Sequence, residues 1–161
     1  MPTTSGRRAN VSLPNDEQVL ITREFDAPRH LVYRAWTTPE LVRRWWTAGR
    51  GEVTACEIDL RVGGRWRYAL RDGDGVESGF HGEYREIVPD ERLVSTEIFE
   101  DLPDAEAVYT VTFVELAAER TLLSILVQHT TRDKRDEYLR YSDGLQEAMA
   151  MFEQVVLELR Q

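Results

Sequence analysis

The sequence predicts an α+β fold in which a curved antiparallel sheet of about six or seven strands wraps around one long C-terminal helix. Three observations lead to this fold class. Strand-like runs separated by short turns follow one another from residue 52 to residue 129. After Arg132 the apolar period changes from two to about 3.6 residues and stays so to the C-terminus. Two short helical patterns follow the first strand.

The N-terminal segment, residues 1–16, is polar and carries no apolar block, so we expect a flexible leader rather than a signal peptide. Residues 17–161 are expected to form a single ligand-binding domain. Its first strand is Gln18–Phe25, in which apolar and polar side chains alternate. Pro28 and Thr38-Pro39-Glu40 then begin two short helices, because proline is favoured in a first turn.

The sheet region is divided by turn signals, of which Gly63-Gly64 and Arg71-Asp-Gly-Asp-Gly75 are the clearest. Six further strands are expected at 52–60, 65–70, 76–87, 93–99, 108–116 and 122–129. Short turns between consecutive strands indicate an antiparallel meander. A twisted sheet of this size curls, and a helix laid in its concave face leaves space for a ligand.

Composition excludes several classes of function. The chain has 161 residues and a formal net charge of −9, which disfavours nucleic acid and anionic membrane surfaces. No apolar run approaches the roughly 20 residues that span a bilayer, so no membrane insertion is expected. The lone cysteine, Cys56, allows no internal disulfide and reads as a buried small side chain. We therefore expect a cytoplasmic protein.

No motif predicts a catalytic, metal or cofactor site. Asp72, Asp74 and Glu83 have the spacing of a calcium loop, but Glu77 stands where that loop requires glycine. The three histidines, His30, His81 and His129, have no metal-ligand spacing. Neither a phosphate loop nor a nucleophile motif is present. We expect no cofactor and no metal.

The aromatic residues are more informative. Four tryptophans occur, at Trp36, Trp45, Trp46 and Trp66. An indole suits the wall of an apolar pocket because its N–H can still donate a hydrogen bond. Packing in the core is the alternative explanation for each of them.

Several motifs together resemble a known family. They are Phe25-Asp-Ala-Pro28, Val32-Tyr-Arg-Ala-Trp36, Pro39-Glu-Leu41 with Trp45-Trp46, Asp59-Leu-Arg-Val-Gly-Gly-Arg-Trp66, Gly82-Glu-Tyr-Arg-Glu-Ile87 with Pro89 and Arg92-Leu93, and Gly144-Leu145 with Met149 and Phe152. Their order resembles the SRPBCC (START-like) superfamily over residues 18–160. Within it, the chain is similar to the group related to the C-terminal domain of the activator of the heat-shock-protein-90 ATPase. Leu145 stands where that group usually has tryptophan.

The resemblance implies the helix-grip fold with a hydrophobic cavity between the sheet and the last helix. It does not imply one activity, because related members include lipid carriers, hormone receptors and aromatase/cyclases. The residues that we expect to contact a ligand are Trp45, Trp46, Trp66, Tyr68, Phe80, His81, Phe99, His129, Tyr141, Leu145 and Met149.

Three functions follow as hypotheses. The first is non-enzymatic binding of a small hydrophobic molecule, such as a lipid, polyketide or aromatic metabolite. The second is a cyclase or hydrolase acting on a polyketide-like substrate, with His81, His129 and Glu57 as candidate acids or bases. The third is a co-chaperone-like module that binds a protein partner. An exposed edge strand in such a sheet would also allow a homodimer.

Overall fold

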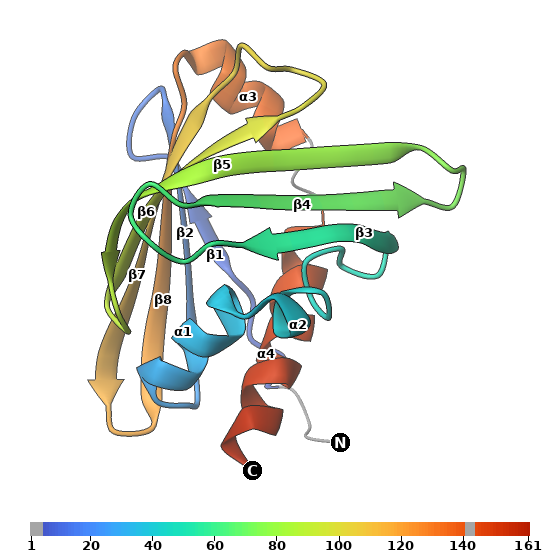
Figure 1. Ribbon diagram of the computed structural model, residues 1–161. Coiled ribbons are helices and arrows are strands. Elements are labelled where there is room, and N and C mark those ends of the chain that lie inside the picture. Colours follow the sequence, from blue (N-terminus) through green and yellow to red (C-terminus); the bar gives the residue numbers. More distant parts are fainter. Residues whose placement is uncertain (1–4, 141–143) are drawn as a thin grey trace.

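The computed structural model describes residues 5–140 and 144–161. Figure 1 shows a long, strongly bent sheet with helices on its concave side. The strands are β1 (Asn10–Ser12), β2 (Gln18–Phe25), β3 (Gly51–Ile58), β4 (Arg65–Asp72), β5 (Glu77–Val88), β6 (Arg92–Phe99), β7 (Ala107–Ala117) and β8 (Arg120–Gln128). The helices are α1 (Arg29–Thr37), α2 (Pro39–Val42), α3 (Arg132–Arg140) and α4 (Leu145–Arg160).

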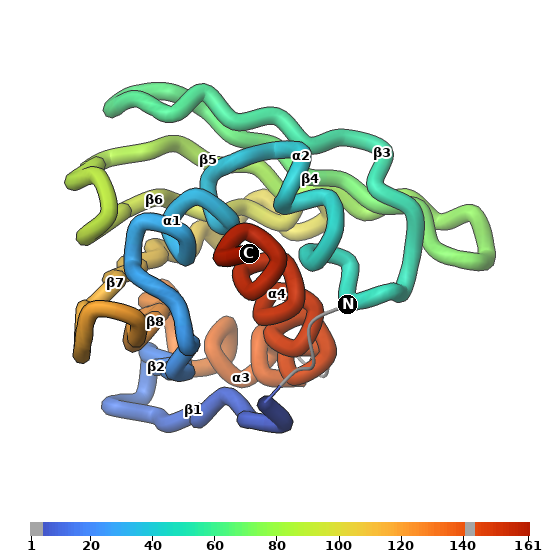
Figure 2. The backbone as a smooth tube through the Cα atoms, turned by 90° about the horizontal axis from the view of Figure 1, so that it is seen from below, coloured from blue at the N-terminus to red at the C-terminus, as the bar shows by residue number. Residues whose placement is uncertain are grey.

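The described strands form one sheet of eight in the order β1-β2-β8-β7-β6-β5-β4-β3, and every neighbouring pair is antiparallel. The sheet does not close, so β1 and β3 are its edges. In Figure 2, α4 runs through the middle of the curve, with β3 and β4 on one side and β1 and β2 on the other. The predicted fold class is thereby confirmed.

The additional strand lies in the segment that the sequence analysis treated as a leader. β1 pairs with β2 through Val11 opposite Ile21. Ala9 is buried, and the side-chain amide of Gln146 on α4 bonds both its N–H and its C=O. Composition missed this strand because it is short and its side chains are exposed.

The helical C-terminus also differs from the prediction, because a single long helix was expected and the described residues after 131 form two, α3 and α4. α3 is strongly polar and buries only Arg135 of its side chains, so it has no apolar stripe to continue into α4. Gly144 occupies the N-cap of α4, where the new helix begins. The expected ligand contact Tyr141 lies outside the described residues.

The segment after α2 is a series of turns. The N–H of Trp45 bonds the carbonyl of Val42, three residues before it, which is the tighter 3₁₀ pattern. Ala48 and Gly49 then adopt positive φ values of 54° and 73°, which a helix does not contain. Trp46 is consequently carried on a turn.

The core lies where α4 meets α1, α2 and β2. Phe152 of α4 makes edge-to-face contacts with Phe25, Trp36 and Trp45, at centroid distances of 5.2, 5.8 and 4.9 Å. Trp36 and Trp45 stack on each other at 5.1 Å. Among the described residues, no helix is both long enough and apolar enough to cross a bilayer.

Candidate functional site

Aromatic side chains gather on the concave face of the β4–β6 half of the sheet. We call Trp46, Trp66, Tyr68, Phe80 and Phe99 the aromatic face. Its rings form a continuous series of contacts. Measured between ring centroids, Trp66 lies 4.8 Å from Tyr68, and Trp46 lies 5.4 Å from Tyr68 and 5.6 Å from Phe80. Phe80 stacks on Phe99 at 4.9 Å. The structure thus brings together five of the predicted ligand contacts.

The strand register explains why these rings meet. Alternate residues of a strand point to the same face, so Trp66 and Tyr68 share a side of β4. Tyr68 is opposite Phe80, and Phe80 is opposite Phe99, in adjacent strands. Trp46, Tyr68, Phe80 and Phe99 are only partly buried, so they keep surface that a ligand could cover.

Trp66 reaches across β5 because its partner there is Gly82. A Cβ atom at Gly82 would lie 1.8 Å from the Thr96 carbonyl oxygen and 2.7 Å from the indole nitrogen. With only hydrogen at that position, Trp66 donates its Nε1–H to the Thr96 carbonyl at 3.2 Å. Gly82 therefore fixes the indole at one end of the aromatic face.

A polar cluster adjoins the aromatic face. Glu97 of β6 accepts a hydrogen bond at 3.0 Å from the hydroxyl of Tyr109 on β7. The hydroxyl of Tyr109 lies 3.5 Å from that of Tyr138 on α3. Burial raises the pKa of Glu97 to about 7, against a smaller lowering from the Tyr109 bond. The carboxyl group can therefore hold or release a proton near neutral pH.

Sequence reasoning missed Glu97, although a signal was present. Leu93, Ser95, Glu97 and Phe99 alternate along β6, and Leu93 and Phe99 mark the inward side. An acid at an inward position of a strand is expensive to bury and points to a partner or a role.

His129 lies at the far end of this cluster. Its side chain is 7% exposed, and its ring lies 4.9 Å from that of Tyr138. Its Nε2 has no hydrogen-bond partner among the described residues. Burial, and next the charge of Arg135, lower the pKa of this imidazole, which favours its neutral form.

Other candidates occupy different places. Trp45 and Met149 are buried in the core, and the Nε1–H of Trp45 donates to the Ala35 carbonyl at 3.1 Å. Leu145, the first residue of α4, packs against the same core. These three side chains support the structure around the aromatic face and do not belong to it.

The candidates His81 and Glu57 lie on the outer face, opposite to their neighbours Phe80 and Cys56. The imidazole of His81 is 2.8 Å from Glu100, which also pairs with Arg67. Arg67 first, and also His81, hold the pKa of Glu100 at about 2. His81 therefore does not join the aromatic face, and the structure separates the three acid–base candidates.

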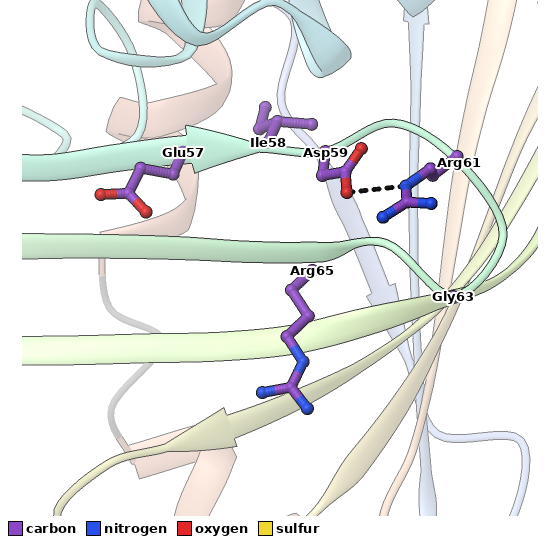
Figure 3. A pocket seen from close by; sticks show the side chains of 6 residues that line it. All are labelled: Glu57, Ile58, Asp59, Arg61, Gly63 and Arg65. Carbon is purple, nitrogen blue, oxygen red and sulfur yellow. Dashed lines mark hydrogen bonds and ion pairs between the residues drawn. The ribbon is translucent and has the colours of Figure 1, made fainter.

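A pocket of about 430 Å³ lies where β3 and β4 meet at their turn (Figure 3). It is lined by Glu57, Ile58, Asp59, Arg61, Gly63 and Arg65. Asp59 and Arg61 form an ion pair at 2.8 Å within it. This pocket is lined mostly by charged side chains, and it lies away from the predicted position between the sheet and the last helix.

The chemistry available to the site is limited. Burial raises the pKa of the Cys56 thiol to about 11, so at neutral pH it is no nucleophile. No group of three metal-ligating side chains occurs among the residues that the structure describes. The aromatic face offers stacking, and the Glu97 cluster offers hydrogen bonding or proton transfer.

A family model named "Activator of Hsp90 ATPase homolog 1-like protein" matches residues 26–156, which is most of the chain. The chain belongs to this family. The family predicted from the sequence motifs is thus confirmed. The family's name describes other members' action on a chaperone and does not by itself assign that action here.

Solved structures share the fold of this Hsp90 ATPase activator homolog 1-like chain. A Rhodobacter sphaeroides protein has a TM-score of 0.83 at 20% identity, covering 95% of this chain and 99% of its own. A Mycobacterium smegmatis protein has a TM-score of 0.82 at 20% identity, and the match covers 95% of this chain and 99% of that protein. A Nitrosomonas europaea protein has a TM-score of 0.79 at 21% identity, and the match covers 92% of this chain and 99% of that protein. No curated protein matches significantly. At these identities, the likeness supports the fold alone.

Proposed function

We propose that this protein binds a small hydrophobic molecule against the aromatic face. The observation that carries the proposal is the run of contacting rings from Trp66 to Phe99, most of which remain partly exposed inside the curve of the sheet. Membership of a family with a ligand-binding fold supports the proposal.

The physical argument rests on apolar area. Covering apolar surface is worth about 25 cal/mol per Å², so a ligand that covers the exposed parts of several rings gains several kcal/mol. Stacked and edge-to-face rings also favour planar partners. Of lipids, polyketides and aromatic metabolites, the aromatic face suits molecules with a planar aromatic body best.

A neutral aromatic probe tests this function. We expect 2-naphthalenemethanol to bind saturably to the wild-type protein, as followed by isothermal titration calorimetry and by tryptophan fluorescence. Phe80→Ala should weaken binding about 10-fold or more, because a buried phenyl contact is worth about 1.5–3 kcal/mol. Val114→Ala, at an exposed position of β7, is the matched control and should bind like wild type. Absence of saturable binding, or equal binding by Phe80→Ala, contradicts the proposal.

A further inference from the structure

Glu97 lies beside the aromatic face, on the concave side of the sheet. It is two residues from Phe99 on β6, so both side chains point to the same side of the sheet. Glu97 is only partly buried, and its charge acts on Tyr68 of the aromatic face, so we expect a molecule lying on Phe99 to come within reach of its carboxyl group. Tyr109 already donates to Oε1 and holds the carboxyl in place.

The groups that face Glu97 carry no compensating positive charge. Tyr109 and Tyr138 are phenols whose pKa values burial raises, so they remain neutral, and the same holds for Tyr68 of β4. Among the described residues, no Lys or Arg pairs with Glu97 or contributes to its pKa, which burial raises to about 7. When ionised, this carboxylate lacks a counter-ion.

His129 does not supply the missing charge. It contacts Tyr138 from the far side, and burial favours its neutral form. Its neighbour Arg135 is already bonded to Asp136 and to the carbonyl of Asn15. Nε2 of this buried imidazole is a further polar atom on the same concave side, and it has no hydrogen-bond partner among the described residues.

We propose that the ligand of the aromatic face carries a protonated amine, and that the Glu97 carboxylate is its counter-ion. This inference rests on the proposed function, because it names the class of molecule that the same surface binds. A charge-assisted hydrogen bond is about twice as strong as a neutral one, so an amine gains more here than a hydroxyl. Aromatic rings add cation–π attraction, and the net charge of −9 favours approach of a cation.

The test compares two probes of nearly equal shape, 2-naphthylmethylamine and 2-naphthalenemethanol, by calorimetry at pH 8. We expect the wild-type protein to bind the amine about 10-fold more tightly than the alcohol. Glu97→Gln should remove this preference while still binding the alcohol. On lowering the pH from 8 to 5, wild type should lose the preference, because Glu97 takes up a proton.

Glu100→Gln is the matched control, since Glu100 is a carboxylate on the outer face of the same strand end. It should keep the amine preference. Equal affinity of wild type for the two probes, or a preference that persists in Glu97→Gln, overturns the amine inference and leaves the proposed function standing. If neither probe binds wild type, the proposed function and the inference are both overturned.

Discussion

Arg23 of β2 and Glu153 of α4 form an ion pair at 3.2 Å in which the two side chains are 1% and 2% exposed. Arg23 also donates to the carbonyl of Met149 at 2.9 Å and to that of Arg7 at 3.1 Å. Ser5 donates to both carboxylate oxygens of Glu153, from its backbone N–H and its hydroxyl. The pair therefore joins the N-terminal segment, the sheet and the last helix.

Removing one partner of this pair should destabilise the fold strongly. We expect Glu153→Leu to lower the free energy of unfolding by about 3 kcal/mol or more, because the buried Arg23 charge is left unpaired. The double variant Arg23→Met/Glu153→Leu should recover much of the loss, since no buried charge remains. Urea denaturation of both variants checks this. A double variant less stable than Glu153→Leu would contradict it.

Gly82→Ala should displace Trp66. The new methyl group would overlap the Thr96 carbonyl and the indole nitrogen, so we expect a loss of about 2 kcal/mol or more. Gly73→Ala is the matched control, because a Cβ at Gly73 meets nothing within 4 Å. The measurement is the midpoint of urea denaturation of each variant, compared at an unchanged dependence of the unfolding free energy on urea concentration. Equal midpoints for the two variants would show that Gly82 tolerates a side chain.

Stability should depend on pH through Glu97. Its pKa is about 7 in the folded protein and near 4.5 when unfolded, so the folded state binds the extra proton between these values. Stability then falls as the pH rises from about 4.5 through 7, by up to about 3 kcal/mol. His129, whose pKa is lowered, acts in the opposite direction. The measurement is therefore the free energy of unfolding of wild type minus that of Glu97→Gln, which should fall by up to about 3 kcal/mol from pH 4.5 to pH 8, because the glutamine stays neutral while Glu97 ionises. A difference in unfolding free energy that stays constant over this pH range would contradict the role of Glu97.

Gln146→Ala should loosen the N-terminal segment. The variant loses both hydrogen bonds to the backbone of Ala9, which is buried, and we expect a cost of about 1–3 kcal/mol. Amide hydrogen exchange of residues 9–12 should become faster. Glu147→Ala, one residue away and exposed, should leave that exchange unchanged. Unaltered protection of residue 9 in Gln146→Ala would refute the assignment.

The strands could be predicted from sequence because burial imposes a period of two wherever one face of a sheet is covered. Gln18–Phe25 matches β2 residue for residue, since its inward positions are all buried. β1 could not be found in the same way, because its three residues are exposed and its pairing depends on β2. The start of α4 as a separate helix could not be predicted either, because it depends on Gly144 at the N-cap, and apolar periodicity gives no information about a glycine.

The candidate site was predictable in part. The five residues of the aromatic face were all among the expected ligand contacts, and their rings meet because aromatic residues at facing positions of adjacent strands lie side by side. Trp45 stacks on Trp36 in the core, and the sequence could not say which of the two adjacent tryptophans, Trp45 or Trp46, would lie there, because that depends on how the turn after α2 closes. Glu97 became recognisable only when the sheet brought it to Tyr109.

The contacts that hold α4 in place affect which parts of the molecule can unfold locally. This helix is held near its start by Ala9, in its middle by the ion pair of Glu153 with Arg23, and at its end by the bond from Arg160 to the carbonyl of Asp26. Segments held by many such contacts unfold only when the whole molecule unfolds, whereas turns with few contacts unfold locally and often. We therefore expect the turn that carries Trp46 to open more often than α4, which would let a molecule reach the aromatic face while the rest of the protein stays folded.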